Sequence, residues 1–448
     1  MTDTLEDLTG ALLSEARKAG AEAADAIAVS GRSVSVGVRA GTLEEAERAE
    51  ATDLGLRVLI GGKQACVSAS DTRRETLAAL AERAVTMARE APEDPHAGLA
   101  DASELCADRD PGPLEMSEDT PEPAPEALER DALEAEAAAL AVPGVTQVQQ
   151  AGAGHGRRQI HMAATNGFSG GFARSENSLH CVAIAGEGTG MERDHDGDAR
   201  VFRTDMRGAT EIGVLAGQRA AERIAPRRPP TGAWPVLYDE RVSASLIGHL
   251  LVAANGSSVA RGASWLIGRM DTPVLSDGLS LIEDPRRKRA FGSRPFDAEG
   301  LQARRREIVS NGILKGWVLD LATARKLGLA STGNAQRGTS APPSPASWNV
   351  ALTQGTHSRD DLIAEMGTGF LVTSLIGSTI NPNTGDYSRG AAGFWVENGE
   401  IAFPVNECTI AGSLPAMLRR MTAANDARPH LTRVVPSLLV EGMTLAGG

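Results

Sequence analysis

The 448-residue sequence is poor in aromatic side chains and in positive charge. It holds only 8 Phe, 5 Trp and 2 Tyr but 49 Gly, so its cores must be built mainly from Ala, Val, Leu and Ile, with many tight turns. The 45 Lys and Arg against 58 Asp and Glu give a net charge of −13. Because phosphate recognition depends on clustered Lys and Arg, this balance argues against an extended nucleic-acid-binding surface.

Long apolar runs and paired cysteines are missing too. No stretch approaches the roughly 18 apolar residues of a membrane span, and the N-terminal segment is acidic and amphipathic, without a signal-peptide pattern. We therefore expect a cytoplasmic protein with no membrane contact. Cys66, Cys106, Cys181 and Cys408 form no CxxC pair, which predicts neither a zinc ribbon nor a disulfide framework but reduced, buried thiols.

Residues 1–225 alternate between helical and strand periodicity, which predicts an N-terminal α/β domain. Helices are expected up to Gly20 and over 74–89, 126–140 and 211–224. Short strands, separated by glycines such as Gly31 and Gly55, are expected over 26–29, 33–38, 54–60, 64–68, 145–150, 159–164, 170–174 and 179–185. The order helix, strands, helix occurs twice, which favours an internal duplication around one mixed sheet.

Residues 92–125 differ from their surroundings, with seven prolines and ten acidic residues against the single Arg109. Such a composition buries little apolar surface, so it predicts an exposed, extended connector within the N-terminal domain.

The proline cluster Pro226, Pro229 and Pro230 predicts a domain boundary, and 232–448 reads as a Gly-rich C-terminal domain of mainly antiparallel β-structure. Asn-Gly turns at 311–312 and 398–399 indicate hairpins. Helices are expected at 244–254 and 413–420. The predicted fold class is therefore α+β.

Local motifs alone do not define a reaction. No two of the eight histidines are spaced for joint metal binding. The acidic segment 192–198 lacks the ligand alternation of a calcium loop and is interpreted as a solvated loop. There is no Walker A sequence, and the glycines of 183–190 do not form a dinucleotide fingerprint. His249, at the border of an apolar helix face, is most simply a hydrogen-bonded structural residue.

Several longer segments carry more information because they occur in a fixed order. They are GSSVARGASWL at 256–266, IEDP at 282–285, GSRPFDAEG at 292–300, GILKGWVLD at 312–320, TARKLG at 323–328, STGNAQR at 331–337 and NPNTGDYSRGAAGFWVENGE at 381–400. Together they resemble the TldD/PmbA family, first described as modulators of DNA gyrase, over nearly the whole chain.

The resemblance implies a two-subunit metalloprotease that encloses unfolded peptides in an internal chamber. In that family the TldD-type subunit holds zinc through a His-Glu-x-x-x-His helix and a C-terminal cysteine, and the PmbA-type subunit, also called TldE, lacks the site. Here His249 matches the second histidine, while Ala244 and Ser245 take the positions of the first histidine and the catalytic glutamate. No cysteine follows residue 408, so the resemblance implies a PmbA/TldE-type chain without catalytic or metal-binding residues.

The leading hypothesis is a zinc-free subunit, inactive alone, that forms a heterodimer with a zinc-containing TldD-type partner. It would supply chamber wall and bind peptide by strand addition. The candidate wall residues are Arg261, Asn334, Arg337, Asn381, Thr384 and Asp386. For each of them a turn or hairpin constraint is the simpler explanation, since Gly, Asn and Asp are the natural residues of turns. The alternatives are a hydrolase active on its own through His249 and a non-proteolytic protein that binds peptides or modulates gyrase. The isolated chain could also form a homodimer.

Overall fold

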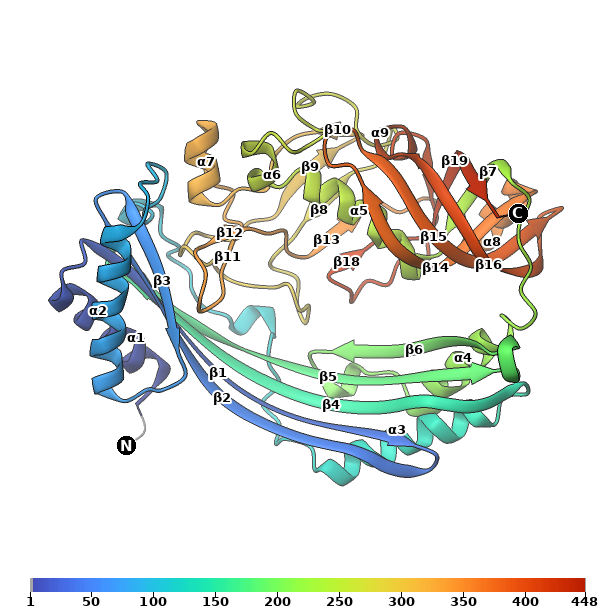
Figure 1. Cartoon of the computed structure of the whole chain (residues 1–448), viewed down its shortest axis with the longest axis horizontal. Coiled ribbons are helices and arrows are strands. Elements are labelled where there is room, and N and C mark those ends of the chain that lie inside the picture. The colour runs from blue at the N-terminus through green and yellow to red at the C-terminus, as the bar shows by residue number, and fades with distance from the viewer. Residues whose placement is uncertain (1–2, 448) are drawn as a thin grey trace.

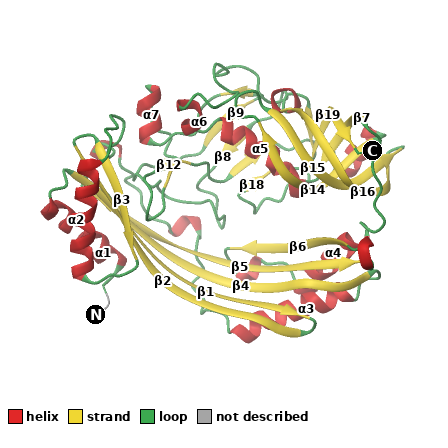
Figure 2. Ribbon diagram, viewed as in Figure 1, coloured by secondary structure: helices red, strands yellow, loops and turns green. Residues whose placement is uncertain are grey.

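The computed structural model describes residues 3–447 and has two parts, an N-terminal sheet with its helices and a C-terminal part that lies over one face of that sheet (Figure 1). The α+β class is confirmed, as Figure 2 shows by element type. None of the helices in the described residues is both long and apolar enough to cross a membrane.

The N-terminal part repeats one pattern twice. Its elements are α1 Leu5–Ala19, β1 Ala23–Arg39, β2 Thr42–Ile60, β3 Lys63–Ala69 and α2 Arg74–Glu90, then α3 Pro125–Leu140, β4 Val145–Ala164, β5 Ser169–Ala185, β6 Glu192–Arg200 and α4 Ala209–Ala221. The sheet order β3-β2-β1-β4-β5-β6 is symmetrical about the central pair β1 and β4. The predicted repeat is thus confirmed at the level of topology, but the sheet is antiparallel throughout and not mixed.

The strands are far longer than predicted, because every glycine was taken as the end of a strand. Some glycines form turns, but others lie within strands. Gly41 and Gly61 have positive φ and form the hairpin turns. Gly31 and Gly55 lie inside β1 and β2 and pair with Ala51 and Ile27 across the ladder. A glycine within a strand leaves the backbone extended and removes a side chain from one face.

All four helices cover the same face of this sheet. Ala26 and Ala28 of β1 pack with α1 and α2, and Val34 and Val36 pack with α3 and α4. Since successive side chains of a strand point to opposite faces, these even-numbered positions share a face. Ile27 is on the other face and packs with Phe296 of the C-terminal part. This second face is called the open face below.

The connector 92–125 was predicted to be exposed, and this is wrong for several of its residues. It has no regular structure beyond two short 3-10 turns, at Ala102–Glu104 and Gly112–Leu114, but Cys106, Leu114 and Met116 are buried. The backbone amide of Ser175 in β5 donates to the Met116 carbonyl. A few apolar residues suffice to hold an otherwise polar segment against the sheet.

The C-terminal part contains a ring of five strands. Its elements are β7 Gly232–Tyr238, α5 Glu240–Ala253, α6 Gly256–Ala260, β8 Leu281–Glu283, β9 Arg306–Ser310, β10 Ile313–Leu314, α7 Leu321–Leu327, β11 Ala335–Gln336, β12 Ser344–Pro345, β13 Val350–Leu352, α8 Arg359–Met366, β14 Gly369–Ile380, β15 Asp386–Glu397, β16 Glu400–Ser413, α9 Leu414–Met417, β17 Met421–Ala423, β18 Arg433–Val434 and β19 Leu438–Ala446. The sheet β16-β15-β14-β7-β19-β17 curls until β16 also pairs with β19.

Two helices lie on opposite faces of this curled sheet. Leu246, Ile247 and Leu250 of α5 are fully buried in the core that includes Val236 and Tyr238. The alternate positions, such as Leu237, pack with α8. The pairing is mainly antiparallel, as predicted, with parallel exceptions at β7–β14 and β13–β18. The predicted hairpins at Asn311 and Asn398 are confirmed.

Candidate functional site

Helix α5 carries the three positions that the sequence matched to a zinc motif. The helix begins after Asp239, whose side chain accepts a hydrogen bond from the Arg241 amide. Ala244, Ser245 and His249 lie beside its buried apolar face and are themselves partly buried. The Ser245 hydroxyl donates to the Val242 carbonyl at 2.7 Å, so it is used within the helix.

His249 is surrounded by cations rather than by acids. Its ring meets Tyr387 of β15 edge-on, with the ring centroids 5.9 Å apart. Burial lowers the pKa of the imidazole, and the positive charges of Arg389 and Arg433 lower it further. The buried Nε2 atom has no hydrogen-bond partner, so the structural role fits but the predicted hydrogen bond is not made at this nitrogen.

These residues do not fit a zinc ion. A zinc site needs three or four N, S or O ligands around the metal, and α5 offers one imidazole beside two arginines whose charge repels a dication. Within residues 3–447, no three His, Cys, Asp or Glu side chains gather in a way that could hold a metal.

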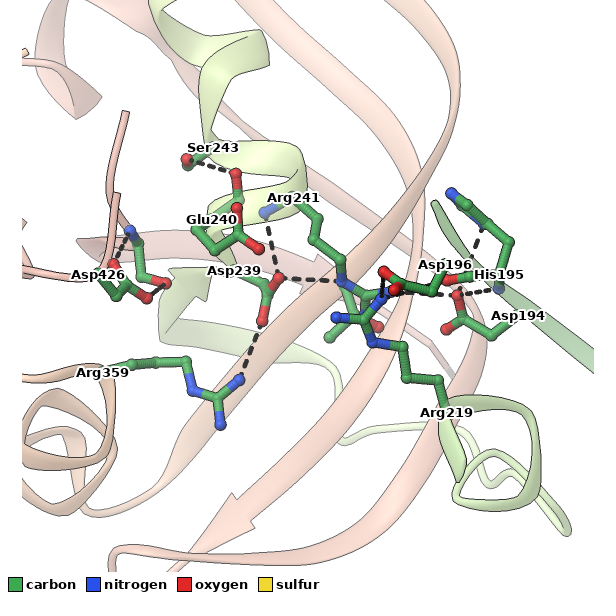
Figure 3. A network of polar contacts seen from close by, with 12 residues as sticks. Asp194, His195, Asp196, Arg219, Asp239, Glu240, Arg241, Ser243, Arg359 and Asp426 are labelled. Carbon is green, nitrogen blue, oxygen red and sulfur yellow. Dashed lines mark hydrogen bonds and ion pairs between the residues drawn. The ribbon is translucent and has the colours of Figure 1, made fainter. Parts of the chain in front are cut away.

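A network of ion pairs fixes the start of α5 against the N-terminal sheet (Figure 3). Arg241 of α5 contacts both Asp239 and Asp194, at 3.1 Å in each case. Asp194 also pairs with Arg223 at 2.7 Å, and Arg223 donates to the Thr373 hydroxyl of β14. We call the contacts of Asp194, Arg223 and Arg241 the β6 joint.

The prediction that 192–198 is a solvated acidic loop is wrong. The segment is the edge strand β6, and Asp194, Asp196 and Asp198 are buried. Asp196 pairs with Arg207 and Arg219, and Asp198 pairs with Arg200. The three alternating aspartates therefore lie on one face of β6, and their charge is neutralised mainly by arginines in α4 and in the segments just before and after it.

A second, more buried contact joins the opposite end of the sheet to the C-terminal part. The Asp25 carboxylate of β1 lies between Arg57 of β2 and Arg337, which follows β11. The two arginine side chains are 4% and 1% exposed. We call these three residues the β1 joint. Phe296 and Phe168 pack beside it, with ring centroids 5.0 Å apart.

Two of the six predicted wall residues are thus inside the protein. Arg337 belongs to the β1 joint. Asn334 is 1% exposed, and its amide donates to Glu283 and to the Ala346 carbonyl, both at 2.9 Å. Their side chains are engaged with the chain's own groups, and their predicted contact with a substrate stays a prediction.

The other four wall residues are exposed but lie in two places. Arg261 follows the short helix α6. Asn381, Thr384 and Asp386 form the turn between β14 and β15, where the Asn381 side chain accepts backbone N–H groups and Thr384 donates to Asp386 at 2.6 Å. These contacts match the turn role that the sequence left open for them.

Between the two joints, the open face of the sheet borders two neighbouring cavities. One has a volume of about 640 Å³ and lies along β1, β2, β4 and β5, and the other, of about 430 Å³, lies along β5 and β6. Phe291 of the C-terminal part lines both. We call the two cavities together the trough. Gly31 and Gly156 lie in its floor, which leaves the sheet backbone uncovered there.

Arg389, Arg433, the trough and the β6 joint were not predicted from the sequence. Alternation along β15 would have placed Tyr387 and Arg389 on one face. Nothing local, however, shows that this face meets α5, or that Arg433 lies next to Gly248. Contacts between segments far apart in the chain leave no periodic signal.

The chain matches known protein domains over most of its length. Three family models match in order, PmbA/TldA metallopeptidase domain 1 over residues 24–88, the central domain over 118–225 and the C-terminal domain over 231–447. The chain therefore has the architecture of a metallopeptidase, although its own α5 does not fit zinc. It belongs to the PmbA/TldD family.

Similar proteins support this membership. Metalloprotease PmbA of Escherichia coli O157:H7 is 35% identical, over 92% of this chain and 90% of the relative. The PmbA homolog of Haemophilus influenzae is 34% identical, over 96% and 94%. A crystal structure from Bacteroides thetaiotaomicron, described as a modulator of DNA gyrase, matches both chains in full with a TM-score of 0.92 and 26% identity. TldE of Thermococcus kodakarensis, at 20% identity and a TM-score of 0.85, covers 98% of this chain and all of its own and shares the fold.

Proposed function

We propose that this chain is the zinc-free, PmbA/TldE-type subunit of a heterodimeric TldD/TldE metalloprotease that acts on unfolded peptides. The observation that carries the proposal is the composition of α5, where His249 stands beside Arg389 and Arg433 with Ala244 and Ser245 at the other motif positions. The likeness to the TldE fold and to PmbA relatives supports it.

In this proposal the partner supplies zinc and the catalytic residues. This chain supplies part of the chamber wall and a surface that binds the peptide. A metal-bound water needs a base to take its proton, and α5 offers no carboxylate for that role. The trough on the open face of the sheet is a surface on which an extended peptide could lie. The exposed turn at Asn381, Thr384 and Asp386, together with Arg261, is a second candidate.

The test is to purify the chain alone and together with a TldD-type subunit. Alone, it should contain far less than one zinc per chain and should not cleave casein. Co-expression should yield a complex of both subunits that cleaves unfolded peptides. His249→Ala in this chain should leave that cleavage unchanged, and an alanine at the first histidine of the partner's motif should abolish it.

Other outcomes point to other functions. Chelator-sensitive cleavage by the isolated chain would contradict the proposal and indicate a hydrolase active on its own. Peptide binding that yields no products, even with the partner present, would favour a non-proteolytic binding protein. The gyrase-modulator description of the Bacteroides relative gives that second function its support.

A further inference from the structure

The floor of the larger cavity in the trough contains two arginines that face each other. Arg158 of β4 and Arg174 of β5 are direct cross-strand partners, and the same row continues through Gly31 and Ala51. Neither small residue adds bulk, so open space remains beside the two guanidinium groups. All four residues line the cavity of about 640 Å³.

Arg174 is held in place without a carboxylate. Its guanidinium donates to the carbonyl oxygens of Phe291 and Ser293, which belong to the C-terminal part. Burial, with a further contribution from Arg158, lowers the pKa of Arg174 to about 10, so the side chain is still cationic at neutral pH. Arg174 thus places a fixed positive charge at the cavity.

Arg158 is exposed, and within residues 3–447 no carboxylate comes within ion-pair distance of either guanidinium. Like charges in direct cross-strand positions repel. The neighbouring row shows how the chain relieves the same repulsion elsewhere. Arg32 and Arg157 also face each other, but each has an acidic partner, Glu50 at 3.3 Å and Asp119 at 4.0 Å.

The lining also indicates what kind of anion would fit. Glu176 and Asp53 line the same cavity, and Asp53 accepts a hydrogen bond from Ser70. Two carboxylates in the lining disfavour a polyphosphate or nucleic acid. A single carboxylate carried on a longer chain can approach the arginines and extend toward the second cavity past Phe291.

We infer that Arg158 and Arg174 bind a carboxylate of an acidic peptide, either a Glu or Asp side chain or a free C-terminus. Guanidinium groups suit this task because their N–H fork matches the two carboxylate oxygens. Arg158 is the exposed ligand and Arg174 the charge held in place by the C-terminal part. The inference rests on the proposed function, whose substrate class it specifies.

The first experiment measures binding of a fluorescent peptide of Gly, Ser and Glu, with an amidated C-terminus, to the full-length chain. Arg158→Gln should weaken binding about tenfold, as expected for loss of a charge-assisted contact. The matched control is Arg48→Gln, which removes an exposed arginine from β2 that pairs with Glu122, outside the trough. It should change binding less than about twofold.

A peptide with Gln in place of Glu should bind about tenfold more weakly to the unchanged protein and be insensitive to Arg158→Gln. Restoring a free C-terminal carboxylate on the Gln peptide separates the two carboxylate sources. In the peptide-free protein, Arg158→Gln should raise the melting temperature slightly because it removes the repulsion. That result also shows that the variant folds.

Equal effects of Arg158→Gln and Arg48→Gln would overturn the inference, as would equal binding of the Glu and Gln peptides. So would failure of the acidic peptide to bind the chain either alone or with a TldD-type partner. These failures are distinguishable from failure of the proposed function. If the Glu and Gln peptides bind equally and cleavage still needs the partner, only the carboxylate site is rejected. If binding depends on Arg158 but no cleavage occurs with the partner, only the proposed protease function is rejected.

Discussion

The β1 joint and the β6 joint connect the same two parts of the molecule but differ in how far they exclude water. In the β1 joint, Arg57 and Arg337 are 4% and 1% exposed, and Phe168 lines the same small cavity as both arginines. In the β6 joint, Arg223 and Arg241 are 10% and 15% exposed and belong to a wider network that reaches solvent. Separating a buried charge pair costs far more than separating a hydrated one.

The two parts are therefore held more strongly at the β1 joint, on one side of the trough, than at the β6 joint on the other side. We expect the β6 joint to open before the β1 joint, because local opening starts where backbone and charges are already partly solvated. The following substitutions test this difference, from the largest expected effect to the smallest.

Asp25→Ala should have the largest effect, since it leaves Arg57 and Arg337 buried without the carboxylate between them. A loss of about 3–5 kcal/mol in the free energy of unfolding is expected in urea titrations. Glu50→Ala is the control, because its pair with Arg32 is exposed, and it should cost less than about 1 kcal/mol. Equal losses in the two variants would contradict the prediction that the buried ion pairs of the β1 joint contribute more to stability than an exposed pair.

Asp194→Ala should cost less, about 1.5–3 kcal/mol, because Arg223 and Arg241, at 10% and 15% exposure, are less buried than the arginines of the β1 joint. Hydrogen exchange should rise in β6 and at the start of α5 and stay unchanged around Asp25. Arg359→Ala, at a 41% exposed side chain of the same network, should cost under about 1 kcal/mol. Faster exchange at Asp25 in the Asp194 variant would mean that the joints are coupled.

Gly55→Ala probes the close approach of the two parts near the β1 joint. A Cβ there would overlap with the Thr339 carbonyl oxygen, so about 1–3 kcal/mol should be lost. Gly31 lies on the same open face, with its nearest such atom at 4.0 Å. Gly31→Ala should therefore be neutral or stabilising by up to about 1 kcal/mol in a thermal melt. A harmless Gly55→Ala would indicate that the joint is wider in solution.

Acid should act on the two ends in opposite directions. Burial, with nearby arginines, lowers the pKa of His430, which is 3.5 Å from Asp198 on β6, to about 4. The unfolded chain therefore binds the proton first, and stability falls as the pH drops from about 6.5 toward 4. Burial raises the pKa of Asp297, near the β1 joint, to about 6. The folded chain therefore binds this proton first, and the destabilising effect of the buried charge is removed as the pH falls from about 6 toward the ordinary pKa of 3.8.

His430→Gln should flatten the loss of stability between pH 6.5 and about 4, and Asp297→Asn should steepen it. Urea midpoints measured across this range give both slopes, and the pH dependence isolates titration from the general cost of each substitution. Identical slopes in the two variants would show that neither group titrates as the structure indicates.

Much of the fold could be predicted from local patterns, and the joints could not. The helix that ends at Gly20 and the hairpins at Gly61, Asn311 and Asn398 follow from turn chemistry and periodicity. The acidic segment of β6 was wrongly predicted to be a loop, because alternating aspartates look the same in a strand and in a polar loop. The distinction depends on the arginines near α4 and in α5 that pair with these aspartates, and the sequence does not show these pairs.

The candidate site was predictable only by resemblance and in part. Alignment with a zinc motif placed Ala244, Ser245 and His249 on one helix, which the structure has as α5. Of the six candidate wall residues, Asn334 and Arg337 turned out to be buried, because Asn and Arg in a loop give no sign of which internal carboxylate they will meet. The cross-strand register of Arg158 and Arg174 likewise required the structure.

The closed ring of strands constrains how the chain is made. Strand β7 is synthesised about 200 residues before β19, one of its two neighbours in the sheet, and β16 also pairs with β19 only when β19 has been made. Until then, the unpaired edges are open to wrong partners. The N-terminal sheet can therefore fold during translation, before the ring of strands can close. The interval between the two events is the period in which the C-terminal part most needs chaperones.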